Sequence, residues 1–118
     1  MADSAELQAM LKILSDGYAA KLPEKFAQIE QQWRQLPEDR WDEACFRELH
    51  RLAHSLTGSG KTYGFPAVSE AARNLETCFA QIAESKAAPD EKQRERVRDL
   101  LNELLHATTQ KEASNHTS

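Results

Sequence analysis

Apolar residues recur at steps of three and four positions along most of this chain, and polar residues fill the positions between them. This spacing places apolar side chains on one face of a helix, so it predicts a series of amphipathic helices. The alternation typical of a β-strand is absent from the sequence, and only four glycines and four prolines interrupt it. The expected apolar stripes cover residues 7–18, 26–36, 45–63, 68–82 and 97–105.

Prolines and glycines mark the expected helix boundaries. Pro23 lacks the amide hydrogen that an α-helix uses, so it predicts a kink or the start of a new helix. Residues 37–39 are expected to form a turn, and the helix after it is expected over residues 41–63. Gly64 is a favourable helix end, and Pro66 is a favourable first residue of the following helix.

Helices with one apolar face and short connections pack as antiparallel bundles. We therefore expect an all-α protein, an antiparallel four-helix bundle with an additional N-terminal helix. The length of 118 residues suits one domain, which we expect over residues 1–109. The remaining residues, 110–118, are polar and are expected to form a flexible tail.

The composition argues against several classes of protein. The net charge is −4 and the isoelectric point is about 5.6, which argues against a nucleic-acid-binding protein. No apolar run in the sequence approaches the length of a membrane span. Cys45 and Cys78 fall on apolar helix faces, which favours two core thiols in a reducing cytoplasm over a disulfide. We expect a cytoplasmic monomer without nucleic-acid or membrane partners.

His54 lies on the polar side of the helix expected over residues 41–63. At about 100° per residue, its side chain points roughly 140° away from the centre of the apolar stripe. Histidine changes charge near neutral pH, and its neutral imidazole is a nucleophile that can accept a phosphoryl group and release it again. The sequence therefore predicts a solvent-exposed, reactive imidazole on a rigid helix.

A strip of basic residues surrounds this imidazole in an otherwise acidic chain. The strip can be an ordinary solvated helix face, or it can neutralise charge during phosphoryl transfer, which depends mostly on positioning and on neutralisation of charge. Its members follow one another at steps of three, four or seven positions: Arg47, Arg51, His54, Gly58 and Lys61, with His50 and Thr57 at the edge.

Two glycines near His54 have different expected roles. Glycine inside a helix is about 1 kcal/mol less favourable than alanine. A glycine at such a position therefore indicates that a side chain there would be a disadvantage. Gly58 lies one turn after His54 on the solvent side, where a missing side chain leaves room for another protein. Gly60 lies on the core side, where it would let a neighbouring helix pack closely.

The residues around His54 resemble the histidine-containing phosphotransfer (HPt) domain of bacterial two-component phosphorelays. The resemblance rests on the segment from His54 to Ser59, on Gly64 and Phe65, and on the alanine-rich helix that ends in Leu75-Glu76. It covers about residues 5 to 107.

The resemblance implies a helical bundle in which His54 accepts a phosphoryl group from an aspartyl phosphate on a receiver domain and passes it to another receiver. A hybrid histidine kinase is a second partner of this kind. Such a domain has no kinase activity of its own and no cofactor, and Mg²⁺ belongs to the receiver. On this interpretation Thr57, Gly58 and Lys61 support the phosphoryl site, and Arg47, His50 and Arg51 contribute to docking.

One position departs from the family pattern. Thr57 stands where the family usually has lysine, three residues after the histidine, and Lys61 is a candidate substitute. The departure keeps a second hypothesis open: a degenerate docking or regulatory module that binds receivers or kinases without phosphotransfer.

Three other patterns in the sequence are weaker evidence for a function. The segment 58–62 ends like a phosphate-binding loop but lacks that loop's first glycine and a preceding strand. His50 and His54 have the spacing of metal ligands on a helix, but the neighbouring arginines disfavour a cation, and we expect no metal site. We expect three glutamates to be isolated helix residues without a partner for acid–base chemistry: Glu30, Glu70 and Glu76.

Overall fold

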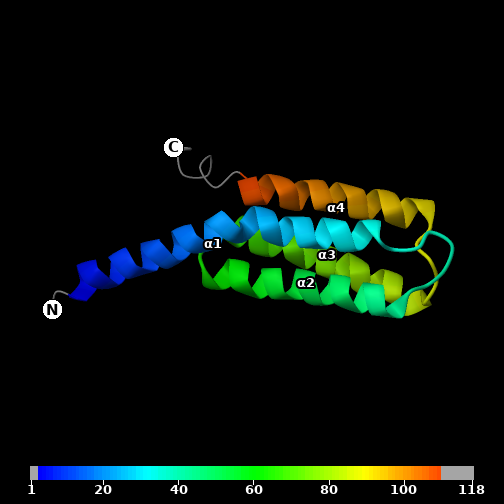
Figure 1. The fold of residues 1–118 in the computed structure, drawn as a ribbon, viewed down its shortest axis with the longest axis horizontal. Coiled ribbons are helices and arrows are strands. Elements are labelled where there is room, and N and C mark those ends of the chain that lie inside the picture. Colours follow the sequence, from blue (N-terminus) through cyan, green and yellow to red (C-terminus); the bar gives the residue numbers. More distant parts are fainter. Residues whose placement is uncertain (1–2, 110–118) are drawn as a thin grey trace.

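The computed structural model describes residues 3–109 as four helices that form an antiparallel bundle (Figure 1). This confirms the all-α class and the bundle, and the described part of the chain contains no strand. The expected tail at residues 110–118 lies outside the described residues. Within residues 3–109, no helix has the length and apolar character needed to cross a membrane. The helices are α1 (Asp3–Arg34), α2 (Glu43–Thr62), α3 (Pro66–Ser85) and α4 (Glu91–Thr109).

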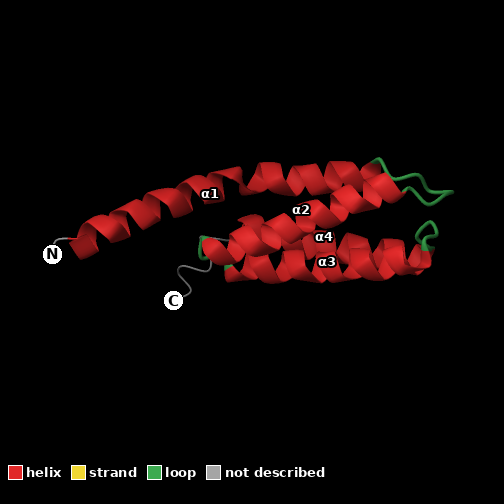
Figure 2. Ribbon diagram, turned by 90° about the horizontal axis from the view of Figure 1, so that it is seen from below, coloured by secondary structure: helices red, strands yellow, loops and turns green. Residues whose placement is uncertain are grey.

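The additional N-terminal helix is not a separate element, because α1 continues through Pro23 as one helix of 32 residues. The neighbours of this proline on the core side are buried, with Leu22 fully inaccessible and Phe26 7% exposed, so packing holds the helix together there. A proline inside a helix bends it, and α1 changes direction where it joins the bundle (Figure 2). Of the two expectations for Pro23, the kink is therefore confirmed and the start of a new helix is wrong.

The first half of α1 also differs from expectation in its packing. The stripe over residues 7–18 was expected to face the bundle, but only its last member, Tyr18, joins the core. The apolar residues from Leu7 to Leu14 lie on the part of α1 that projects beyond the other helices, and they are more than half exposed. Periodicity predicted the apolar face but not where the bundle ends.

The core lies between the apolar faces of the four helices, and α2 and α3 form the most closely packed pair. Gly60 has the role expected of it, because a β-carbon there would lie 3.0 Å from the backbone nitrogen of Ser69. Cys45 and Cys78 are free thiols in this core, as the helix pattern indicated. The largest fully buried side chains are Phe79, Leu22, Ile29, Leu49, Leu75, Ile82, Leu100, Leu104, Val68 and Val97.

The turn between α2 and α3 fixes how these two helices face each other. Gly64 adopts φ of +84°, the left-handed conformation that ends many helices. Its amide donates to the carbonyl of Lys61 at 3.3 Å, and the amide of Phe65 donates to the carbonyl of Gly60 at 2.7 Å. These two bonds form a Schellman motif. Pro66 then starts α3, as the sequence predicted.

Candidate functional site

His54 projects into solvent from the middle of α2, and 72% of its side chain is exposed. The core-facing neighbours Ala53 and Leu56 are buried, which fixes the orientation of the helix. The pattern of apolar residues predicted this arrangement. An imidazole on the exposed face of a packed helix can meet a partner protein without any rearrangement of the bundle.

A carboxylate from the neighbouring helix holds the imidazole. Oε2 of Glu76, on α3, lies 2.6 Å from Nδ1 of His54. A carboxylate accepts hydrogen bonds, so Nδ1 carries the hydrogen of this contact. In the neutral ring, the lone pair is then on Nε2. Glu76 itself is only 20% exposed, so its geometry is more restricted than that of a free surface residue.

Thr57 completes the support for this carboxylate. Its hydroxyl lies 3.0 Å from the carbonyl of Ala53 and 3.3 Å from Oε1 of Glu76. The two oxygens of Glu76 therefore have different neighbours, with His54 at one and Thr57 at the other. Thr57 contacts the residue that orients the imidazole, which is a role that the sequence did not predict for it.

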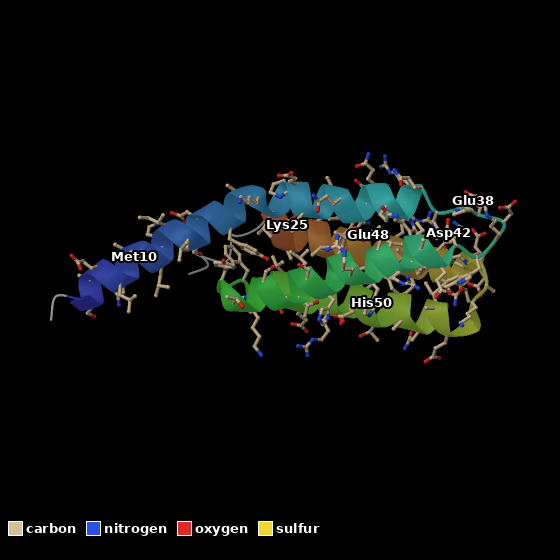
Figure 3. All side chains as sticks on the ribbon, turned by 60° about the horizontal axis from the view of Figure 1, so that its bottom comes forward. Met10, Lys25, Glu38, Asp42, Glu48 and His50 are labelled. Carbon is tan, nitrogen blue, oxygen red and sulfur yellow. The ribbon has the colours of Figure 1, made fainter. Side chains whose placement is uncertain are left out.

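His50 lies near the same carboxylate. Its Nε2 is 3.8 Å from Oε2 of Glu76, and its ring is almost parallel to that of His54, with the centroids 6.2 Å apart. Figure 3 shows His50 on the side of α2 next to α3, and Glu48 on the side next to α1. The negative charge of Glu76 thus faces two imidazoles one helical turn apart.

Gly58 leaves the surface open beside this cluster. A β-carbon at Gly58 would meet nothing within 4 Å, and the residue is exposed. Since Gly58 follows His54 by one helical turn, a partner can approach the imidazole there without meeting a side chain. The structure agrees with the steric role expected of this glycine.

The arginines of the basic strip do not gather at His54. Arg51 forms a two-contact ion pair with Glu48, at 2.6 and 2.9 Å, and Arg47 pairs with Glu43 at 3.2 Å. The hydrogen bond from Arg51 lowers the pKa of Glu48 and raises the pKa of Arg51 itself. In this structure the guanidinium of Arg51 contacts Glu48 and not the imidazole, and its part in neutralising charge during transfer stays a prediction.

Lys61 lies two turns beyond His54, in a hollow of about 380 Å³ between the end of α2 and the start of α3. Arg73 and Glu70 line the same hollow. The structure therefore brings Lys61 together with a second cation from α3, which the sequence did not indicate. It does not bring Lys61 to the imidazole, and its substitution for the missing lysine stays a hypothesis.

The sequence pattern did not indicate the contact of Glu76 with His54, because Glu76 stands alone on its helix in the sequence. A signal was available, because His54 and Glu76 stand at equal sequence distances from Phe65 in the turn. In an antiparallel helix hairpin, residues at equal sequence distances from the turn lie at the same level along the two helix axes. Among the described residues, no cluster of histidine, cysteine, aspartate and glutamate is arranged to hold a metal ion.

Comparison with known proteins gives one match. A family model described as Hpt domain matches residues 14–107. No curated protein matches, and no solved structure matches. The matched region begins within the exposed half of α1 and includes the whole His54 site.

Proposed function

This chain belongs to the Hpt domain family, and from that premise we propose that it is a phosphorelay intermediate with His54 as the phosphoacceptor. His54 takes a phosphoryl group from the aspartyl phosphate of a receiver domain and passes it to another receiver. The observation that carries the proposal is the contact between Nδ1 of His54 and Glu76, which leaves the lone pair of the neutral ring on Nε2 of a side chain that is 72% exposed.

The chemistry follows from this geometry. The lone pair of Nε2 forms a bond to phosphorus while the bond between phosphorus and the aspartyl oxygen breaks, and the aspartate leaves as a carboxylate. The imidazole gains positive charge, which the Glu76 carboxylate at 2.6 Å stabilises. No proton has to leave the ring during the step. Transfer to a second receiver is the reverse reaction on a different aspartate.

The partner supplies the remaining components. We propose a receiver domain, alone or in a hybrid histidine kinase, that carries Mg²⁺ at its own aspartate, while this chain contributes no cofactor. Docking would use the open surface at Gly58 and the outer face of α2 that carries Arg47, His50 and Arg51. The chain would then be a phosphocarrier without kinase activity. The implied compartment is the cytoplasm, where thiols such as those in its core stay reduced.

Thr57 supports a second candidate function. A hydroxyl at this position cannot neutralise a phosphoryl group as a lysine can, and Arg51 is occupied by Glu48. The alternative is a module that docks on receivers or kinases and regulates them without taking the phosphoryl group.

One experiment separates the two functions. Receiver domains loaded with radioactive phosphate are mixed with the chain, and the label on the chain is tested for lability in acid and stability in base. We expect such a label on the wild type and its loss in His54→Gln. The matched control His106→Gln removes an exposed imidazole on α4, outside the proposed site, and should keep the label. Receiver binding without any transferred label would support the docking module.

A further inference from the structure

The first half of α1 forms an arm that lies outside the bundle. We define its apolar stripe as Leu7, Met10, Leu11 and Leu14, which are between 53% and 59% exposed. Met10 is labelled on the projecting arm in Figure 3. The family match begins at residue 14, so most of this arm lies outside the matched region.

The arm continues the core-facing side of α1 beyond the end of the bundle. Contact with the other helices begins at Ser15, whose hydroxyl lies 3.5 Å from the carbonyl oxygen of Tyr63. Tyr18 then stacks on Tyr63, with the ring centroids 4.7 Å apart. Because the arm is continuous with the rest of α1, its helix needs no separate nucleation, but it leaves large apolar side chains in water. Contiguous exposed apolar side chains are typical of an interaction surface.

The spacing of the stripe identifies the kind of partner. The steps between Leu7, Met10, Leu11 and Leu14 are three, one and three, so the pattern is the same from either end. A twofold dimer interface requires a surface that complements itself. If two arms pair antiparallel, Leu7 of one copy faces Leu14 of the other, and Met10 faces Leu11.

The positions of the charged residues on the arm and the area of the two apolar stripes are compatible with this pairing. Lys12 and Asp16 form an ion pair at 3.1 Å on the side of the arm away from the stripe, so the pairing buries neither charge. Two stripes with their flanking side chains would remove on the order of 1,000 Å² from water, the lower bound for specific interfaces. The arm also projects from the end of the bundle, away from the middle of α2, so His54 would stay accessible (Figure 1).

We propose that two copies of this chain associate through their N-terminal arms, which pair as an antiparallel two-helix coil centred between Met10 and Leu11. The partner surface is the same stripe on a second copy. The proposal does not depend on phosphotransfer at His54. It replaces the sequence expectation of a monomer.

Sedimentation equilibrium and light scattering on the full chain at increasing concentration test the proposal. We expect the mass to rise from 13.3 kDa to twice that value, with half-association in the micromolar range that suits a small interface. The variant Leu7→Glu/Leu14→Glu places like charges in the stripe. It should raise the dissociation constant by at least about a hundredfold.

The matched control is Ala5→Glu/Ala9→Glu, which adds the same charge to the opposite side of the arm. It should dimerise like the wild type, and circular dichroism should show folded bundles for both variants. A cysteine at Met10 should form an interchain disulfide readily, whereas a cysteine at Ser4 should not, because antiparallel arms separate the two Ser4 positions. A monomeric mass up to about 1 mM overturns the proposal. So does a dimer that the stripe variant leaves intact, or a preference for the Ser4 cross-link.

Discussion

Glu76, on α3, contacts one ring nitrogen of His54, on α2, with Oε2 at 2.6 Å from Nδ1. The contact joins two helices across 22 residues of sequence and gives the exposed imidazole one defined orientation. Without it, an imidazole that is 72% exposed would rotate freely and would offer either nitrogen to a phosphodonor.

Replacement of Glu76 by alanine should therefore slow phosphoryl acceptance by roughly 10-fold to 100-fold, by analogy with residues that orient metal-bound histidines. Glu76→Gln should have an intermediate effect, because the amide oxygen still accepts from Nδ1 but carries no charge. The rate of phosphohistidine formation measures both. Glu84→Gln, an exposed change near the end of α3, is the control. Equal rates for wild type and Glu76→Ala would refute the orienting role.

Introduction of lysine at Thr57 should accelerate transfer several-fold. A cation three residues after His54 lies on the same side of α2, where it can neutralise charge on the phosphoryl group. Ser55→Lys adds the same charge on the side of α2 that faces Lys25 and Gln28 of α1, and it should leave the rate near that of the wild type. Equal acceleration by the two lysines would indicate a general effect of net charge.

A bulky acidic residue at Gly58 should block transfer while the bundle stays folded. Gly58→Glu fills the open space beside His54 and brings a negative charge towards an anionic phosphoryl group. Transfer from a loaded receiver and helix content by circular dichroism are the two measurements. Transfer at the wild-type rate would show that receivers do not use this surface.

Alanine at the two helical glycines should change stability in opposite directions. Gly58→Ala meets nothing within 4 Å and should stabilise the helix by about 0.5–1 kcal/mol, because alanine is the better helix former. Gly60→Ala forces a methyl group to within 3.0 Å of the Ser69 backbone and should destabilise the protein by about 1–3 kcal/mol. Urea unfolding of both variants checks the sign of each change.

Stability should decline in alkaline solution, partly through Tyr18. Burial raises the pKa of this phenol above its ordinary value of 10.0, against the opposing effect of its hydrogen bond with Ser59 at 2.7 Å. The folded protein therefore holds the phenolic proton more tightly. This contribution is fully present below pH 10 and is lost as the pH rises through the higher folded pKa.

Tyr18→Phe removes the titrating group, so its unfolding free energy should fall less steeply above pH 10 than that of the wild type. Tyr63→Phe removes the phenol of a stacked neighbour whose charge also raises the pKa of Tyr18, so it should reduce the decline only in part. Parallel slopes for wild type and Tyr18→Phe would remove Tyr18 as a source of the decline. Denaturant titrations at several pH values give these slopes.

The sequence predicted those features that depend on a single helix. The exposure of His54 and the open space at Gly58 follow from a period of 3.6 residues, and the turn at Gly64 follows from the conformational freedom of glycine. Each of these features requires only the residues of one helix or one turn.

Apart from the close packing of Gly60 against α3, the contacts between helices were not predicted. Glu76 gains its role because α3 folds back along α2, and periodicity within α3 contains no information about that pairing. Likewise Leu7 and Leu14 have the spacing of core residues, and only the end of the bundle leaves them exposed. Arg51 turned to a near neighbour, Glu48, because a contact three residues away on one helix forms more readily than one with a distant charge.

The contact between His54 and Glu76 uses the same rotation of α3 that buries its apolar face. One residue inserted into the first turns of α3 would rotate the rest of that helix by about 100°. Glu76 would then leave the imidazole, and Leu75 and Phe79 would leave the interior, in the same movement. Insertions between Pro66 and Leu75 therefore cannot change the surroundings of His54 while sparing the core, whereas substitutions on the outer face of α2 can.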